Sequence, residues 1–549
     1  MAACRPHVLS VPAGCPFLPT LVDALVEGRL IAGFPADPMA LADATIYLPT
    51  RRAARALTSL LADRADGQAL LLPRIVPLGE TDEAEFDLSS TIGGFNDPDV
   101  VSPPISPIER RLILTRLVQR WSAEVDRDLL RLGPGIPFMV PASPADAVNL
   151  AGDLEALMDA FTNEGVPWDG LAAAVEADYS TYFEITLKFV RIAADNWPKI
   201  LADRKASDPA RRRNALIAAE AGRLARERPS APIIAAGSTG TMPATASLLA
   251  AIARLPRGAV VLPGLDQHLD EESWDAITRN DETDLVHGHP QGSLRRLLEH
   301  QLGMKRAEVE TLGTPTEAAA ARGRLLSEAL RPADTTDRWA LLPNEERLAL
   351  GEAGCRGLAL VEAADERDEA LAIAVALRET LTEPGRTAAL VTPDRTLATR
   401  VVAELARWDL EVEDSAGVPL TESQTGRLAR LAADAAALDF HPVRVLALLA
   451  HPQVRLGWER HEVARAAATL EIGVLRGPAP AAGLDGLREA LAACRTDTTR
   501  RLPLPARRLT ETDWDCAAAL LERLTVAFGG FTAEALGEDA LDLVRVAER

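Results

Sequence analysis

The first part of the chain alternates short aliphatic runs with segments whose apolar residues recur every three or four positions. His7 to Val11 predicts a strand, and the periodicity from Phe17 to Val26 predicts a helix that follows a turn at Pro12-Ala13-Gly14. Thr45 to Leu48 predicts a second strand, and Arg51 to Asp63 a second helix. This alternation is typical of an α/β fold, in which helices cover a mostly parallel sheet.

The pattern changes at residue 81. Residues 81–107 are acidic and rich in glycine and proline without periodicity, which predicts a linker or long loop. The loop ends in Ser106-Pro107-Ile108-Glu109, a helix-capping signal. Helical periodicity then continues to about Arg228, so we expect a helical insertion over residues 106–228.

Strand patterns return at Pro232 to Ala236 and Ala259 to Leu262, joined by a helix from Ala244 to Arg254. Two strands joined by a helix suit the edge of the first sheet better than a separate domain. Residues 1–105 and 229–350 are therefore expected to form the first lobe.

A second α/β unit is expected over residues 351–440. Strand patterns at 358–361, 388–391 and 410–412 alternate with helical patterns at 366–381 and 395–408. Residues 441–549 show helical periodicity to the end without a terminating signal, so this helical region is expected to be incomplete.

Composition narrows the class of protein. A chain of 549 residues is too long for one ordinary domain, and 47% hydrophobic with 25% charged residues excludes wholesale disorder. The formal charge of −21 argues against a protein that binds nucleic acid through its overall electrostatic field. Any DNA contact must therefore be local. The five cysteines contain no CxxC pair, which leaves no readable disulfide framework or metal ligand set. No signal peptide or run of about 18 apolar residues is present, so a soluble, cytoplasmic protein is expected.

Several segments resemble one known family. Three of them are ADATIYLPTRRAARALTSLL, IIAAGSTGTMPATASLLAAIARLPRGAVVLPGLD and RTAALVTPDRTLATRVVAELARWDLEVEDSAGVPL. They are similar to the AddB subunit of bacterial AddAB helicase–nucleases, particularly the alphaproteobacterial type. The likeness runs from the first residues to beyond 450, in the family's order. It implies a superfamily 1 helicase-like body with two RecA-like lobes over 1–105 with 229–350 and over 351–440. It also implies that this chain is the N-terminal part only, without the C-terminal nuclease domain.

The resemblance implies a function in double-strand break repair. The chain would be the non-motor subunit of an ATP-dependent helicase–nuclease, acting as scaffold and DNA channel while an AddA-like partner supplies the ATP motor. DNA ends and single-stranded DNA would be the other partners. ATP, magnesium and an iron–sulfur cluster are expected only for the full complex, and no cofactor for this chain. Two alternatives stay open: a DNA-independent interaction scaffold, and an autonomous helicase-like NTPase.

The first strand–turn–helix is where such a motor carries its P-loop. A P-loop needs glycines for a cradle of N–H groups, a lysine for the phosphates and a Ser or Thr for magnesium. The turn here offers Gly14 and Thr20 but no lysine, and its prolines remove N–H donors. We therefore interpret it as a degenerate P-loop that serves as a structural turn, a loss that alphaproteobacterial AddB proteins share.

The strand at 232–236 stands where an active motor would end in Asp-Glu, but it ends in Gly237-Ser238-Thr239-Gly240. The turn is expected to be structural, with an N–H nest for an anion as the alternative. Catalysis by this chain stays uncertain, because it contains no complete ATPase site. No nuclease pattern of a strand-borne Asp with a following acidic-x-Lys element is found in the last hundred residues either.

Candidate DNA-binding residues follow two strands. Thr50, Arg51, Arg52 and Arg55 lie at a helix start, where N–H groups, a hydroxyl and Arg side chains suit a phosphate; a solvated basic face is the alternative. In the second unit, Thr392 and Arg395 are the family-based candidates, while Asp394 is expected to be a helix N-cap.

Two further residue types are assigned structural roles. His287 and His289 lack a third ligand at fixed spacing, so they are expected to be polar loop residues rather than a metal site. Trp121, Trp197 and Trp408 lie at core spacing on helices and are not expected to stack on bases.

Overall fold

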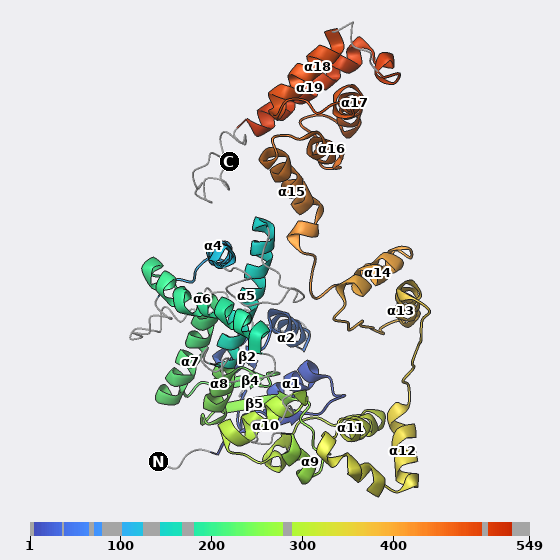
Figure 1. Cartoon of the computed structure of the whole chain (residues 1–549). Helices are drawn as coiled ribbons and strands as arrows, with labels where there is room; N and C mark the ends of the chain where they lie inside the picture. The colour runs from blue at the N-terminus through green and yellow to red at the C-terminus, as the bar shows by residue number, and fades with distance from the viewer. Residues whose placement is uncertain are drawn as a thin grey trace. The chain divides into compact units, whose positions relative to one another are not determined.

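The computed structural model describes residues 5–35, 38–64, 71–78, 102–124, 143–166, 180–277, 288–496 and 503–529. The chain divides into two compact units, Met1–Ala359 (unit 1) and Leu360–Arg549 (unit 2) (Figure 1). Most of the expected linker over 81–107, and the last twenty residues, lie outside the described residues.

Unit 1 is built on one six-stranded parallel sheet, which confirms the α/β class. Its strands, in the order β3-β2-β4-β5-β1-β6, are β1 (Val8–Val11), β2 (Thr45–Leu48), β3 (Arg74–Pro77), β4 (Ile233–Ala236), β5 (Gly258–Pro263) and β6 (Glu310–Thr311). Sequence patterns found four of these strands and missed β3 and β6. These two are the edge strands. β6 has only two residues, both polar, and in β3 the apolar pair Ile75-Val76 is bounded by Arg74 and Pro77, so neither shows a clear strand pattern.

The expected place of β4 and β5 at the edge of the sheet is wrong. They lie in its centre, with Ile46 of β2 opposite Ile234 of β4 and Val8 of β1 opposite Val260 of β5. Parallel strands that are covered on both faces are apolar throughout, and all four residues of β4 are buried. Such a continuous apolar run is typical of a central strand, whereas the connection pattern along the chain does not reveal where a strand inserts.

Alternate residues of the strands pack against helices on opposite faces. One core cluster joins Leu9, Ile46 and Ile234 to helices α1 (Phe17–Val26) and α2 (Arg51–Arg64). The other joins Val8, Ile233 and Val260 to α7 (Pro209–Glu227) and α8 (Pro243–Ala253). The sheet is therefore the middle layer of three, and its carboxyl edge carries the turns after β1, β2 and β4.

The described residues of the expected insertion 106–228 are helical apart from short connections, as predicted. They form α4 (Pro107–Glu124), α5 (Pro144–Glu164), α6 (Ser180–Arg204) and α7. Leu114, Val118, Leu154 and Trp197 belong to their shared core. The rest of unit 1 contains α9 (Glu271–Ala276), α10 (Gly292–Arg296), η5 (Leu297–Leu302), η6 (Arg306–Glu308), α11 (Glu317–Ala329), η7 (Ala333–Leu341) and α12 (Asn344–Cys355), besides η1 (Pro38–Asp43).

The second α/β unit forms its helices but not its sheet. Helices α13 (Glu366–Leu381) and α14 (Arg395–Ala406) are present as predicted, yet residues 358–361, 388–391 and 410–412 are in no strand. Leu360 is 87% exposed and Val391 92%. The strand predictions here are wrong for the described chain, because β-prone side chains set a preference while a ladder needs a neighbouring backbone.

The C-terminal part of unit 2 is helical in its described residues, as expected. It contains η8 (Leu420–Glu422), α15 (Gln424–Ala437), α16 (Pro442–Ala450), α17 (Arg460–Leu470), η9 (Glu471–Leu475), α18 (Gly483–Thr496), η10 (Ala506–Arg508) and α19 (Glu511–Phe528). Val445, Ala466, Leu487 and Leu520 are fully buried members of one core. Among the helices that the structure describes, none is long and apolar enough to cross a bilayer.

Candidate functional site

The turn after β1 is a tight β-turn rather than a wide loop. The N–H of Cys15 donates to the carbonyl of Pro12 at 3.1 Å, and Gly14 has φ +90°. A positive φ at the third position of a hydrogen-bonded turn is the type II geometry, which selects glycine there. One of the few N–H groups that could face a phosphate is thus used within the turn. Burial also raises the pKa of the Cys15 thiol.

Three other glycines bring neighbouring segments against this turn and helix α1. A Cβ built on Gly237, after β4, would lie 3.3 Å from the Phe17 ring, and one on Gly264, after β5, 3.8 Å from the Cβ of Ala13. A Cβ on Gly313, after β6, would lie 2.9 Å from Cγ2 of Thr20. The turn after β1 and the start of α1 are therefore packed against the segments that follow β4, β5 and β6.

The turn after β4 lies beside the turn after β1, as the contact between Gly237 and Phe17 shows. The N–H of Gly237 donates to the carbonyl of Val261 at 2.9 Å, and the N–H of Gly240 donates to Oγ of Ser238 at 3.4 Å. Two N–H groups of the possible anion nest are thus engaged inside the protein, which favours a structural turn. The turns after β1 and β4 therefore meet at one edge of the sheet.

The N-terminus of α2 presents the first set of DNA-binding candidates. Oγ1 of Thr50 accepts the N–H of Ala53 at 3.1 Å, so this hydroxyl caps the helix. Arg51 is half-buried, while Arg52 and Arg55 are exposed. Cations at a helix N-terminus oppose its dipole, and an anion bound there would relieve this cost.

The second set, Thr392 and Arg395, belongs to unit 2, and both residues have partners inside the protein. Oγ1 of Thr392 accepts the N–H of Asp394 at 3.0 Å. Arg395 forms a bidentate pair with Asp414, at 3.1 and 2.5 Å, and this hydrogen bonding raises the pKa of its guanidinium. A phosphate at Arg395 would have to compete with this carboxylate. Asp394 accepts the N–H groups of Thr396 and Leu397, which confirms it as the N-cap of α14.

His289 has a structural role. Its Nε2 lies 2.8 Å from the carbonyl oxygen of Leu330, and its Nδ1 accepts the N–H of Gln291. His287 lies outside the described residues. Within the described ranges no group of three or more His, Cys, Asp or Glu side chains has a geometry that could hold a metal ion.

The tryptophans lie in or beside cores. Trp121 and Trp197 are buried, as predicted, and the indole N–H of Trp197 donates to Asp208 at 3.1 Å. Trp408 is half-buried beneath the guanidinium of Arg378 at 4.7 Å. None of these three rings is presented as an open stacking platform.

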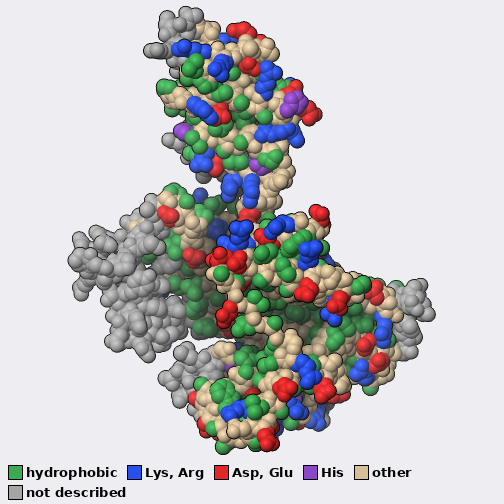
Figure 2. Space-filling view, turned by 90° about the vertical axis from the view of Figure 1, so that its right-hand side faces the viewer, with side chains coloured by type: hydrophobic (Ala, Val, Ile, Leu, Met, Phe, Trp, Pro, Cys, Tyr) green, Lys and Arg blue, Asp and Glu red, His purple; other side chains and the backbone are tan. Residues whose placement is uncertain are grey.

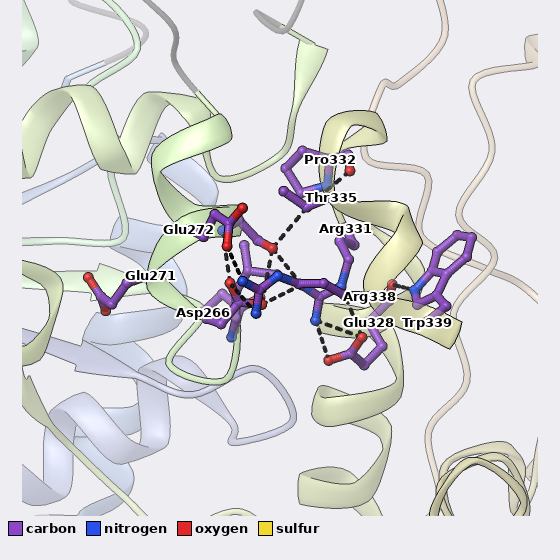
Figure 3. A network of polar contacts seen from close by, with 12 residues as sticks. Asp266, Glu271, Glu272, Glu328, Arg331, Pro332, Thr335, Arg338 and Trp339 are labelled. Carbon is purple, nitrogen blue, oxygen red and sulfur yellow. Dashed lines mark hydrogen bonds and ion pairs between the residues drawn. The ribbon is translucent and has the colours of Figure 1, made fainter. Parts of the chain in front are cut away.

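Sequence patterns missed two buried ionic networks. In the insertion, Arg110 is 7% exposed and pairs with Asp159 at 2.7 Å and Asp208 at 3.1 Å. In the second network, Asp270 accepts from Arg331 and from Ser273, Ser273 contacts Thr335, and Arg331 also pairs with Glu328 (Figure 3). Asp208 and Asp270 are the N-cap residues of α7 and α9, but their ionic partners are far apart in the sequence, so local patterns do not reveal these networks.

Charges are mixed on the molecular surface. On the face drawn in Figure 2, Lys and Arg side chains are interspersed with Asp and Glu and separated by hydrophobic side chains. This arrangement agrees with the negative net charge and leaves local clusters such as the start of α2 as the candidate contacts for nucleic acid.

No protein-family model matches this chain, and no curated protein matches its sequence. The class that the structure itself defines is an α/β protein with a six-stranded parallel sheet and extensive helical additions.

Proposed function

We propose that this chain is an AddB-like, non-motor subunit of a cytoplasmic, ATP-dependent helicase–nuclease that resects DNA ends for recombination. Unit 1 would be a RecA-like lobe that keeps the shape of a motor and provides part of a DNA track. An AddA-like partner would supply the ATPase. The ordered sequence resemblance is the source of this proposal.

One observation carries the non-motor role. The turn after β1 has the strand–turn–helix setting of a P-loop, yet it is closed by an internal hydrogen bond, lacks a lysine and touches three neighbouring segments. A triphosphate needs both the positive charge and the open N–H groups of that loop. The chain therefore depends on another subunit for ATP turnover.

DNA contact is assigned to the start of α2. Arg52 and Arg55 are exposed beside the N-terminal N–H groups of the helix, at the carboxyl edge of a parallel sheet. Arg395 is the second candidate, and a phosphate there would have to compete with Asp414. The alternative, a scaffold that does not touch DNA, is favoured by the net charge of −21.

Fluorescence anisotropy with a labelled duplex that carries single-stranded tails tests this assignment. Binding by the full chain should weaken as salt rises, and Arg52→Ala/Arg55→Ala should weaken it about tenfold, since each lost phosphate contact removes part of the electrostatic attraction. Arg427→Ala/Arg430→Ala on α15 is the matched control, because it removes two exposed arginines at the same spacing. No binding at low salt would instead support the DNA-independent scaffold.

A further inference from the structure

Strand β6 runs parallel beside β1 at the edge of the sheet. β6 pairs with β1, Leu9 opposite Glu310 and Ser10 opposite Thr311, and the N–H of Leu312 donates to the carbonyl of Ser10 at 2.8 Å. Leu312 is buried in the core cluster beneath α1 and α2. The residues that follow Leu312 therefore leave the sheet at the edge where β1 enters its turn.

The residues that follow then lie close against the turn after β1 and against α1. A Cβ on Gly14 would lie 2.7 Å from the Cβ of Ala319 and 3.6 Å from its Cα, so the first turn of α11 lies directly against Gly14. Gly313 has φ +91° and lies against Thr20, the residue that a P-loop would turn toward magnesium. Thr316 caps α11 through the N–H of Ala319, which fixes the start of the helix at this contact.

The far end of α11 is also fixed. Arg331, just past its C-terminus, has a side chain only 5% exposed and pairs with Glu328 at 2.7 Å and with Asp270 (Figure 3). The indole N–H of Trp339 donates to the carbonyl of Glu328 at 3.0 Å. Because both ends are anchored, moving α11 off the turn would break packing at one end or buried ion pairs at the other.

We infer that residues 312–320 form a built-in plug that occupies the phosphate position beside the β1 turn. The site then lacks both the lysine that would bind phosphate and the space for it. Unit 1 is held in one conformation and does not change conformation with nucleotide binding. This inference rests on the proposed origin of the turn as a nucleotide site. It predicts that a restored lysine is not sufficient for binding.

Restoring the lysine tests the plug directly. Pro19 precedes Thr20 as the lysine precedes Ser or Thr in a P-loop, so the variant is Pro19→Lys and its matched control is Pro19→Ala. Binding of a fluorescent ATP analogue with magnesium is measured for the full chain and both variants. With the plug in place, the Pro19→Lys variant should bind within about threefold of the control. Tightening of tenfold or more in that variant would overturn the plug, while the proposed non-motor role of the natural chain would stand.

A double-mutant cycle checks the contact without nucleotide. Gly14→Ala and Ala319→Gly should each lower the melting temperature, and their combination should lower it by about 2 °C less than the sum, because Ala319→Gly removes the methyl group that collides with the new one. Gly14→Ala combined with Ala318→Gly is the control, since Ala318 is exposed on the same helix. Additive losses in both pairs would contradict the plug.

Discussion

Asp270 joins three elements of unit 1 at a single side chain. It caps α9 by accepting the N–H of Ser273 at 3.0 Å, and it pairs with Arg331, which follows α11, and with Arg338 of η7. Burial opposes its ionisation, but the hydrogen bonds from Arg331 and Ser273 outweigh this and lower its pKa to about 2. A carboxylate whose pKa falls on folding stabilises the folded state while it is ionised.

The contribution of Asp270 should disappear in acid. Because its pKa is lowered, its stabilisation is present above about pH 4 and is lost as the pH falls toward 2. The side chain is 32% exposed, so solvent screening limits the effect to about 1 kcal/mol. Asp270→Asn should therefore be less stable than the natural chain at pH 7 by urea unfolding, and the difference should shrink between pH 4 and pH 2. A difference that grows toward low pH would contradict this account.

Single residues also show which structural roles local sequence signals are sufficient to predict. Asp394 was predicted as a cap and is one, because capping depends on two or three neighbouring residues. The ion pair of Arg395 with Asp414 was not predicted, since its partner lies nineteen positions away. Likewise, the phenol of Tyr47 donates to Glu220, 173 positions away. Burial raises the pKa of this phenol most, and the nearby Glu220 carboxylate raises it further.

At the scale of elements, α13 and α14 share a small core of their own. Ala370, Ala374, Val401 and Leu405 are the fully buried residues of their shared core. Leu390 is partly buried against this core, whereas Leu358, Leu360, Val361 and Val391 are exposed. We therefore expect fully buried residues such as Leu405 to contribute much more to the stability of this helix pair than exposed ones such as Val391.

Two substitutions compare the contribution of a buried and of an exposed apolar side chain to the stability of this helix pair. Leu405→Ala removes a fully buried side chain and should lower the free energy of unfolding by about 2 kcal/mol. Val391→Ser alters a side chain that is 92% exposed and should change it by less than about 0.5 kcal/mol. Urea unfolding measures both. If Val391→Ser cost as much as Leu405→Ala, residues 388–391 would be packed in solution.

At the scale of the whole molecule, the proposed function assigns DNA contact to this chain and ATP hydrolysis to a partner subunit. Unit 1 would provide the sheet, the turns at its carboxyl edge and the basic N-terminus of α2. The turn after β1 is packed against neighbouring segments of the chain. A machine of this kind needs ATP turnover from its partner, and the net charge of −21 limits nucleic-acid contact to local sites.

The purified natural chain should not hydrolyse ATP. Phosphate release with magnesium should stay at the background rate with and without single-stranded DNA, because charge and space for a triphosphate are both missing at the β1 turn. Adding an AddA-like subunit should raise turnover that depends on the partner's own P-loop lysine. DNA-stimulated hydrolysis by the chain alone would contradict the non-motor role and favour the autonomous NTPase.

The sequence by itself determined the positions of β1, β2, β4 and β5, of helices α1, α2 and α8, and of the start of α4, because hydrophobic period and capping are local properties. It also determined that the turn after β1 and the start of α1, residues 12–20, contain no lysine. Only the tertiary structure decided that β4 and β5 are central, that α11 lies against Gly14, and that Asp414 neutralises Arg395. The segments of unit 2 that were expected to be strands also show what local sequence cannot determine. A strand pairs with a backbone that is distant along the chain, and local residue preference does not say whether such a partner is present.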